Sequence, residues 1–579
     1  MPLLMNSHQH PYNYLFKSCS SLKTLKQIHG RILTTGSSKN LVLVTKLITL
    51  ACNLSENMFY ARNMFDEIPL GDRDVFIWNT LIRGYSDKGP CKEAIVVYKK
   101  MHENGFLPDH YTFPFVIRSC GVISGLRQGK EVHCNVIKHG FDMNDFVQSS
   151  LVAMYSRNGE MSSSELVFGE IVEKDVVTWT SLIAGYVQNG LFIEGLNGFQ
   201  RMVASRIQPN KVTLVSVLPA CAVLNLLNLG ETIHGTGIKL GVDLDISFIN
   251  ALISMYGKCR VDGNNENVNR ARILFDGMVV RDTVSWNAMI AAYEQNKLGS
   301  DAIQLFRRML SQNVDFDYIT LVSVISACAQ SGDFNNGEWV RHLVTRKRLE
   351  NSLSITNALI DMYAKCGSID LAQEVFDRLP ERTVVSWTAM IYACAVNGHG
   401  NDALDMFSRM LEEKVKPNSF TFIAVLTACK HSGLVEEGKK YYMSMKKDYS
   451  IVPSVEHCAC MVDLLSRAGL LAEAYEFIEK MLVEPDAGVW GSLLSACSIY
   501  ENVEMAERVA ERLNKLDLKN ETYYVLMSKI YAQAGTPEKA ARFRTLMKDR
   551  ALKKTPGLSS VEFYLRSHTF PSESHSHPS

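Results

Sequence analysis

Short polar side chains recur at one fixed position along this chain of 579 residues. Each directly follows a tryptophan within a nearly constant phrase, and these tryptophans lie 101, 107 and 101 residues apart. Asparagine and threonine carry hydrogen-bonding groups but no charge. Their alternation on a constant frame therefore suits recognition of a ligand that presents hydrogen-bond donors and acceptors along one edge. The four residues, in chain order, are Asn79, Thr180, Asn287 and Thr388.

The constant frame around this position predicts a helix. Trp78, Leu81, Ile82 and Tyr85 follow the i, i+3, i+4, i+7 spacing of one apolar stripe. A second stripe of the same kind follows after a glycine or a polar turn. A hairpin this small cannot bury both of its faces alone, so neighbouring hairpins must cover it. The sequence therefore predicts an all-α solenoid of helix-turn-helix repeats.

Each period contains three related segments of 35, 35 and 31 residues. The first carries the tryptophan phrase, the second phrases such as "TLVSVLPAC" from Thr213, and the third phrases such as "NALIDMYAKC" from Asn357. About fourteen such repeats are expected over residues 8–486. Residues 1–7 would then be a short N-terminal segment.

Charge and hydropathy exclude some classes of protein. The chain has 61 basic and 61 acidic residues, so the global basicity of many nucleic-acid binders is missing and any such binding must use a local surface. No apolar run is long enough for a transmembrane helix, and we expect no membrane association. The first 55 residues lack Asp and Glu, as in an organellar transit segment. The alternative, which we favour after His10, is an ordinary first repeat, leaving residues 1–7 as a targeting remnant.

The cysteines and histidines do not form a metal site. Cys120, Cys221, Cys328 and Cys429 recur with the repeat, as small buried apolar residues do. The chain has no C-x-x-C pair and no H-x-E, which a zinc-dependent deaminase requires. We therefore expect no cofactor, no metal and no enzymatic activity of the chain itself.

The alternation of 35, 35 and 31 residues, with "NALIDMYAKC" and the "VFDRLPER" ending at Val375, resembles the plant pentatricopeptide repeat proteins of the PLS class. The tetratricopeptide repeat fits less well, because its unit and its W-x-x-L-G-x-x-Y pattern differ. The resemblance implies a right-handed superhelical α-solenoid.

After the repeats, residues 487–557 resemble the E1 and E2 motifs of the E subgroup. Family members usually have a Ser-Trp pair after the closing Pro-Gly, whereas Leu558 and Ser559 stand here. We therefore interpret residues 558–579 as a degenerate C-terminal tail. The resemblance implies that a DYW-type deaminase, which follows in relatives, would be supplied in trans.

In this family, the fifth residue of a repeat and its last residue read one RNA base, while the second residue pinches the base plane. Carried over, the second residues are Phe76, Val177, Val284 and Val385. The reading pairs are Thr45 with Asp74, Asn79 with Asp109, Ser149 with Asp175, Thr180 with Asn210, Asn250 with Asp282, Asn287 with Asp317, Asn357 with Thr383, and Thr388 with Asn418.

The resemblance assigns a base to each pair. Asn with Asp implies uridine, Thr with Asn adenosine, and Thr or Ser with Asp guanosine; Asn357 with Thr383 is off-pattern and only pyrimidine-leaning. The middle segments carry Pro114, Val215, Val322 and Ile423, which offer no hydrogen bond. A structural alternative is that Asn and Thr near a helix start simply cap or support the first turn.

The resulting hypothesis is a site-recognition factor for C-to-U editing of organellar transcripts, in the mitochondrion or, alternatively, the chloroplast. It would bind single-stranded RNA and recruit a deaminase. The alternatives are a factor for RNA stability, splicing or translation, and a helical-repeat scaffold for proteins.

Overall fold

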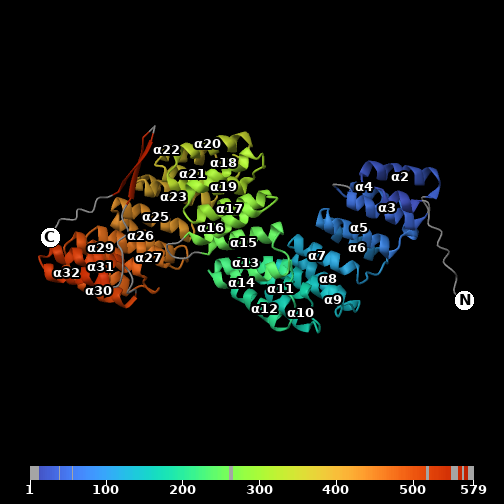
Figure 1. Cartoon of the computed structure of the whole chain (residues 1–579), viewed down its shortest axis with the longest axis horizontal. Helices are drawn as coiled ribbons and strands as arrows, with labels where there is room; N and C mark the ends of the chain where they lie inside the picture. The colour runs from blue at the N-terminus through green and yellow to red at the C-terminus, as the bar shows by residue number, and fades with distance from the viewer. Residues whose placement is uncertain are drawn as a thin grey trace. The chain divides into compact units, whose positions relative to one another are not determined.

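The computed structural model describes residues 12–549, apart from 38–39, 55–56, 260–264 and 517–520, together with residues 558–563 and 566–571. Residues 1–7, predicted as an N-terminal segment, lie outside this range. The chain divides into two units, residues 1–296 and 297–579, and each is described by itself. Within each unit, helices form hairpins that stack in chain order (Figure 1).

The first unit is entirely helical over its described residues. Its helices are α1 (Tyr12–Lys17), α2 (Leu22–Thr34), α3 (Leu41–Leu54), α4 (Phe59–Asp66), the 3₁₀ helix η2 (Leu70–Asp72), α5 (Val75–Asp87), α6 (Cys91–Glu103), α7 (Thr112–Val122), α8 (Leu126–Lys138), α9 (Asp145–Arg157), α10 (Met161–Glu170), α11 (Val176–Gln188), α12 (Phe192–Ala204), α13 (Lys211–Val223), α14 (Leu227–Lys239), α15 (Ile246–Lys258), α16 (Glu266–Gly277) and α17 (Thr283–Gln295).

The second unit continues the helical hairpins and ends in two short strands. Its helices are α18 (Gly299–Ser311), α19 (Tyr318–Ser331), α20 (Phe334–Arg346), α21 (Leu353–Lys365), α22 (Ile369–Asp377), α23 (Val384–Val396), α24 (Gly400–Glu412), α25 (Ser419–Ser432), α26 (Val435–Lys447), α27 (Val455–Arg467), α28 (Leu471–Glu479), α29 (Ala487–Ile499), α30 (Val503–Leu516), α31 (Glu521–Gln533) and α32 (Pro537–Asp549).

The prediction of an all-α solenoid is confirmed for the repeats: from α3 to α15 and from α19 to α29, each first helix packs on the second helix of its own hairpin and on the first helix of the next. In the predicted tail, β1 (Leu558–Phe563) pairs antiparallel with β2 (Arg566–Pro571), in the register Leu558 opposite Pro571. These strands were not predicted from the sequence. The superhelical hand remains a prediction, because the two units are described separately.

The repeated tryptophans form the core of the stack. Each packs edge-on against a phenylalanine from the second helix of the preceding hairpin, with ring centroids 4.8 to 5.0 Å apart. Each indole N–H is buried without a hydrogen-bond partner, so the ring contributes through packing. The pairs are Phe65 with Trp78, Phe168 with Trp179, Phe275 with Trp286, and Phe376 with Trp387.

A second repeated contact fixes the spacing of adjacent first helices. Asn189, at the end of α11, donates its Nδ2 hydrogens to Gly185 O in its own helix and to Ser156 O at the end of α9, 2.8 Å away. Asn397 makes the equivalent bond to Ala364 O at 2.9 Å. Because each of these bonds joins the ends of two adjacent first helices, they hold neighbouring repeats in register.

Candidate functional site

The eight predicted last residues lie at the starts of first helices, where they satisfy backbone N–H groups of the first turn. In the Asp and Asn residues, Oδ1 accepts from the N–H three residues later, at N···O distances of 2.8 to 2.9 Å. Thr383 uses Oγ1, at 3.4 Å. These contacts have the geometry of N-caps, so the capping alternative holds for the last residues. They are Asp74, Asp109, Asp175, Asn210, Asp282, Asp317, Thr383 and Asn418.

Capping does not explain the choice between Asp and Asn. The two residues are about equally good N-caps, and both cap through Oδ1, as Asp175 and Asn210 do. The second side-chain atom differs, because Oδ2 of Asp accepts hydrogen bonds whereas Nδ2 of Asn donates them. An exchange of Asp for Asn therefore keeps the cap and inverts the polarity of the remaining atom.

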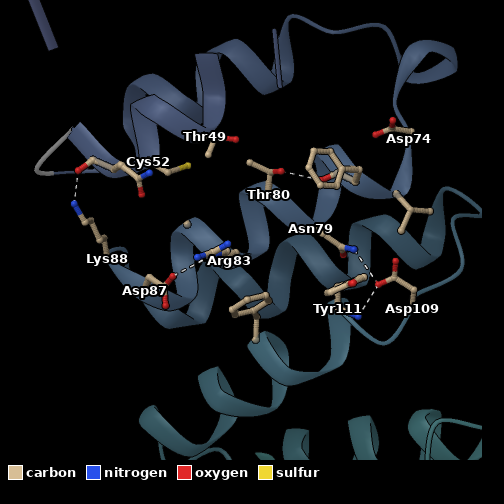
Figure 2. Close-up of a pocket in the computed structure, with 15 residues that line it drawn as sticks. Thr49, Cys52, Asp74, Asn79, Thr80, Arg83, Asp87, Lys88, Asp109 and Tyr111 are labelled. Carbon is tan, nitrogen blue, oxygen red and sulfur yellow. Dashed lines mark hydrogen bonds and ion pairs between the residues drawn. The ribbon is translucent and has the colours of Figure 1, made fainter. Parts of the chain in front are cut away.

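The fifth residues lie one turn into the first helices, and two of them bond directly to the last residue of the same repeat. Asn79 Nδ2 donates to Asp109 Oδ1 at 2.9 Å (Figure 2), and Asn250 Nδ2 donates to Asp282 Oδ1 at 3.3 Å. Burial raises the pKa of Asp282, but hydrogen bonds from Ser285 and Asn250 outweigh it and hold that pKa below its ordinary value. The carboxylate is therefore ionised at neutral pH and can accept from a ligand.

In three other repeats a threonine hydroxyl joins the fifth residue to the last. Thr180 Oγ1 lies 2.6 Å from Thr213 Oγ1, which donates to Asn210 Oδ1 at 3.0 Å. The same pattern joins Thr388 to Asn418 through Thr421, with distances of 2.7 and 3.0 Å. Ser149 reaches Asp175 through Thr178, with distances of 2.8 and 2.7 Å. Residues about thirty positions apart are thus brought into one polar site.

Two predicted pairs differ from this arrangement. Thr45 donates its hydroxyl to Leu41 O at 2.7 Å and, among the described residues, makes no hydrogen bond to Asp74. Asn357 makes none to Thr383, and its Oδ1 is buried without a partner. Asn287 and Asp317 belong to different units: Asn287 is buried in α17, and Asp317 caps α19.

The predicted pinching residues are exposed apolar side chains beside the reading pairs. Phe76 is 67% exposed, and Val177, Val284 and Val385 are 53 to 59% exposed. Such residues near the start of a helix have no partner in the fold. Their exposure provides flat apolar surface on which a planar ligand can stack.

The structure adds members to this set of exposed apolar side chains, which we call the apolar row. The new members lie in repeats for which no pinching residue was predicted from the sequence. Six of the residues three positions before the other fifth positions are also exposed and apolar, with Tyr111 at 63%, Phe146 at 75% and Phe420 at 70%, whereas Ser247 and Ser354 stand there before Asn250 and Asn357. The constant offset was the signal that could have identified them. The additional members are Val42, Tyr111, Phe146, Val212, Ile319 and Phe420.

Two hollows lie side by side along this row in the first unit. One, of about 790 Å³, is lined by Asn79, Asp109, Phe76 and Tyr111, and it also contains the Arg83 guanidinium (Figure 2). The other, of about 700 Å³, is lined by the preceding repeat's Thr45 and Asp74 with Val42 and Phe76. Phe76 separates them. Each hollow thus contains a fifth residue, a last residue and two apolar walls.

A metal site, a reactive cysteine and a membrane-spanning helix find less support in the part of the chain that the structure describes. There, no group of three or more His, Cys, Asp or Glu side chains is placed to hold a metal ion. The recurring cysteines are buried, which raises the pKa of Cys120, Cys221, Cys328 and Cys429 to about 12. No helix in the described ranges is long and apolar enough to cross a membrane.

Family models match most of the chain. The PPR repeat family model matches residues 73–121, 174–223, 281–330 and 382–431, and a PPR repeat model matches 149–176, 354–384, 420–449 and 457–484. A model for the E motif matches residues 500–562, which overlaps the region predicted as E1 and E2.

Curated relatives come from Arabidopsis thaliana. A chloroplastic pentatricopeptide repeat-containing protein is 39% identical over 570 residues, which cover 98% of this chain and 69% of the relative. A putative pentatricopeptide repeat-containing protein is 35% identical over 570 residues, which cover 96% of this chain and 100% of the relative. A putative mitochondrial one is 39% identical over 502 residues, 86% of this chain and 80% of that protein.

Among solved structures, the chain is similar to the maize pentatricopeptide repeat protein PPR10 in complex with an 18-nt psaJ RNA element. The TM-score is 0.55 at 17% sequence identity, over 93% of this chain and 78% of that one. At this identity the likeness establishes the solenoid fold.

Proposed function

Because this chain belongs to the plant pentatricopeptide repeat proteins of the PLS class and carries an E motif, we propose that it binds single-stranded RNA sequence-specifically. Each reading repeat would hold one nucleotide, with its polar edge against a fifth and a last residue and, in most repeats, with the base between two exposed apolar side chains. PPR10, which shares the fold, was solved with an RNA element, and this supports the proposal.

The observation that carries the proposal is the pairing of Asn79 with Asp109 in an open hollow. Capping occupies Oδ1 of the last residue, so its second atom is left for a ligand. Uracil and guanine present an N–H at the centre of the Watson–Crick edge, where adenine and cytosine present a bare nitrogen. Asp at the last position therefore suits uridine or guanosine, and Asn suits adenosine or cytidine.

The fifth residue then separates pyrimidines from purines. Asn79 uses Nδ2 as a donor to Asp109, and its second Nδ2 hydrogen suits O4 of uracil. Thr213 gives its only hydroxyl hydrogen to Asn210, so Thr180 must donate to Thr213 and keeps only lone pairs. Those lone pairs suit the amino group of adenine. The same assignments follow from the family resemblance.

Taken in chain order, the pairs define an RNA sequence. Written 5′ to 3′, it is G-U-n-G-A-n-U-U-n-(C/U)-A-n-n, where n marks repeats whose fifth residue is apolar or uninformative. In the register typical of the family, the target C follows after about three further nucleotides. The pair Ala459 with Asp486 supplies the last n.

We propose further that this binding directs C-to-U editing of organellar transcripts and that a DYW-type deaminase acts in trans. The E motif is consistent with this role. Relatives are named both chloroplastic and mitochondrial, and the mitochondrion is our first choice. A role in RNA stability, splicing or translation is the second candidate, since the reading pairs would serve it equally.

The editing proposal is tested by sequencing organellar transcripts from plants with and without this protein. We expect loss of editing at one or a few cytidines that follow the predicted sequence. Normal editing at every site, combined with altered abundance or splicing of one transcript, would favour the second candidate. A protein that pulls down partners despite ribonuclease and shows no RNA affinity would be a scaffold instead.

A further inference from the structure

The third residue of each repeat varies with the fifth residue of the repeat before it. Where the fifth residue is polar, a hydroxyl residue stands at the third position of the next repeat in seven cases. Where the fifth residue is Pro114, Val215 or Val322, the next third residue is Val147, Phe248 or Ile355. The polar combinations are Asn79 with Thr112, Ser149 with Thr178, Thr180 with Thr213, Asn250 with Ser285, Asn287 with Thr320, Asn357 with Ser386, and Thr388 with Thr421.

Hydrogen bonds account for four of the five threonine members of this correlation. Thr112 Oγ1 donates to Asn79 Oδ1 at 2.7 Å and lies 2.9 Å from Asp109 Oδ1. Thr178, Thr213 and Thr421 contact their fifth residues at 2.6 to 2.8 Å. These hydroxyls are buried, so water does not replace the bond when it is lost.

The serine members behave differently. Ser285 Oγ donates to the cap Asp282 at 2.8 Å, as a threonine there would, but Asn250 Oδ1 is buried and has no hydrogen-bond partner. Asn357 Oδ1, whose next third residue is Ser386, is equally without a partner. Asn79 Oδ1, by contrast, is satisfied by Thr112. The three asparagines therefore differ in how firmly their amides are held.

Thr45 is the exception in sequence. Its next third residue is Ile77, which has no hydroxyl, and Thr45 instead donates to Leu41 O of its own helix at 2.7 Å. Ser149 Oγ lies 2.8 Å from Thr178 Oγ1 and also 2.7 Å from Asp145 O of its own helix, so the bond to the helix backbone does not by itself distinguish Thr45.

From these contacts we propose that a threonine at the third position of the following repeat is a third member of the reading site and positions the fifth side chain for the base. The inference rests on the proposed RNA binding and deepens it. With threonine, the fifth side chain is oriented before RNA arrives, so a mismatched base meets a fixed pattern of donors and acceptors. With serine, as at Asn250, the amide is held only by the last residue.

The consequence is a difference in specificity between sites of the same type. Asn79 with Asp109 and Asn250 with Asp282 both suit uridine, but only Asn79 has a fixed Oδ1. Discrimination against other bases should be stronger at the second position of the RNA site than at the seventh.

The test compares Thr112→Val with Ser285→Ala. Both remove a hydroxyl that lies 2.8 to 2.9 Å from a capping carboxylate oxygen, but only Thr112 contacts a fifth residue. Fluorescence anisotropy measures the ratio of dissociation constants for RNAs mismatched and matched at one position. We expect T112V to lower the ratio at the second position about three- to tenfold, the net worth of one hydrogen bond. Ratios at other positions should stay unchanged, and S285A should leave the ratio at the seventh position as it was.

A second variant, Thr213→Val, should act in the same way on the adenosine at the fifth position. If the wild type discriminates at these positions but the ratio of dissociation constants is unchanged in both threonine variants, this inference is overturned. An equal loss of affinity for every RNA would also overturn it, since the hydroxyl would then serve only the fold. If the wild type shows no discrimination at the second position, the proposed RNA reading fails, and the inference fails with it.

Discussion

Asp109 Oδ1 accepts the amide of Asn79 and the backbone N–H of Thr112 at the same distance, 2.9 Å. One atom thus joins the last residue of a repeat both to the fifth residue of that repeat and to the helix of the next. The capping role and the proposed reading role belong to different atoms of the same side chain. They can therefore be separated by substitution.

The substitution Asp109→Asn keeps the capping oxygen and replaces Oδ2 by an amide donor. Because Asn and Asp cap about equally well, we expect the melting temperature to stay nearly constant. The base preferred at the second position of the RNA should change from uridine to cytidine, by roughly tenfold in relative affinity. Anisotropy titrations with the two RNAs measure this change.

Asn210→Asp is the reciprocal variant, and it should shift the fifth position of the RNA from adenosine to guanosine. A pair of variants that lose affinity without any change of preference would contradict the assignment of Oδ2 and Nδ2 to the base.

The apolar row should contribute affinity without specificity. Phe76→Ala removes the wall between the two hollows, and stacking of a base on an aromatic ring is worth about 1–3 kcal/mol. We expect a similar loss of affinity for matched and mismatched RNAs. Phe59→Ala is the matched control, because Phe59 is 73% exposed but does not line either hollow. Equal binding by F76A and the wild type would argue against stacking at this position.

Thiol labelling tests the placement of the recurring cysteines. Burial raises the pKa of Cys120, Cys221, Cys328 and Cys429 to about 12, so their thiols are protonated and shielded at pH 8. Iodoacetamide should modify the exposed Cys134 first, and mass spectrometry of short labelling times should find these four unmodified. Rapid modification of any of them in the folded protein would show that its hairpin opens.

The start of α15 should show a dependence on acid. A hydrogen bond from Lys211, with Nζ–Oδ2 2.8 Å, and one from Ser247 lower the pKa of Asp245 to about 2. A carboxyl whose pKa is depressed by folding stabilises the protein above its unfolded pKa of about 3.9, and this stabilisation is lost as the pH falls toward 2.

Asp245→Asn should therefore lower the melting temperature at pH 6 and have little effect near pH 2. Differential scanning calorimetry at both pH values measures the difference. A gap between the two proteins that is as large at pH 2 as at pH 6 would contradict the assignment.

Much of the fold could be predicted from the sequence because the repeat period is visible in the spacing of single residues. The spacing of Trp78, Trp179, Trp286 and Trp387 indicated stacked hairpins, and their rings do pack between repeats. The site was harder to predict, because a polar residue that faces a ligand and one that supports a neighbour look alike in sequence. The bond from Thr180 to Thr213 spans 33 residues and joins two hairpins. Only the relative placement of the first helices reveals it.

The apolar row shows a second limit. Phe146 and Phe420 occupy the same offset as Phe76, but apolar residues near a helix start are usually expected to be buried. Their exposure of 75% and 70% could be known only from the packing of the hairpins. The strands β1 and β2 were not predicted because the tail was interpreted only by its departure from the family pattern.

The central claim is that this chain reads bases in single-stranded RNA through its reading pairs. A gel shift with the predicted RNA and with a variant whose adjacent uridines, read by Asn250 and Asn287, are both changed to adenosine tests it most directly. We expect the unchanged RNA to bind about tenfold more tightly or better, since each mismatched base removes hydrogen bonds from buried polar groups. Equal binding of the two RNAs would contradict it.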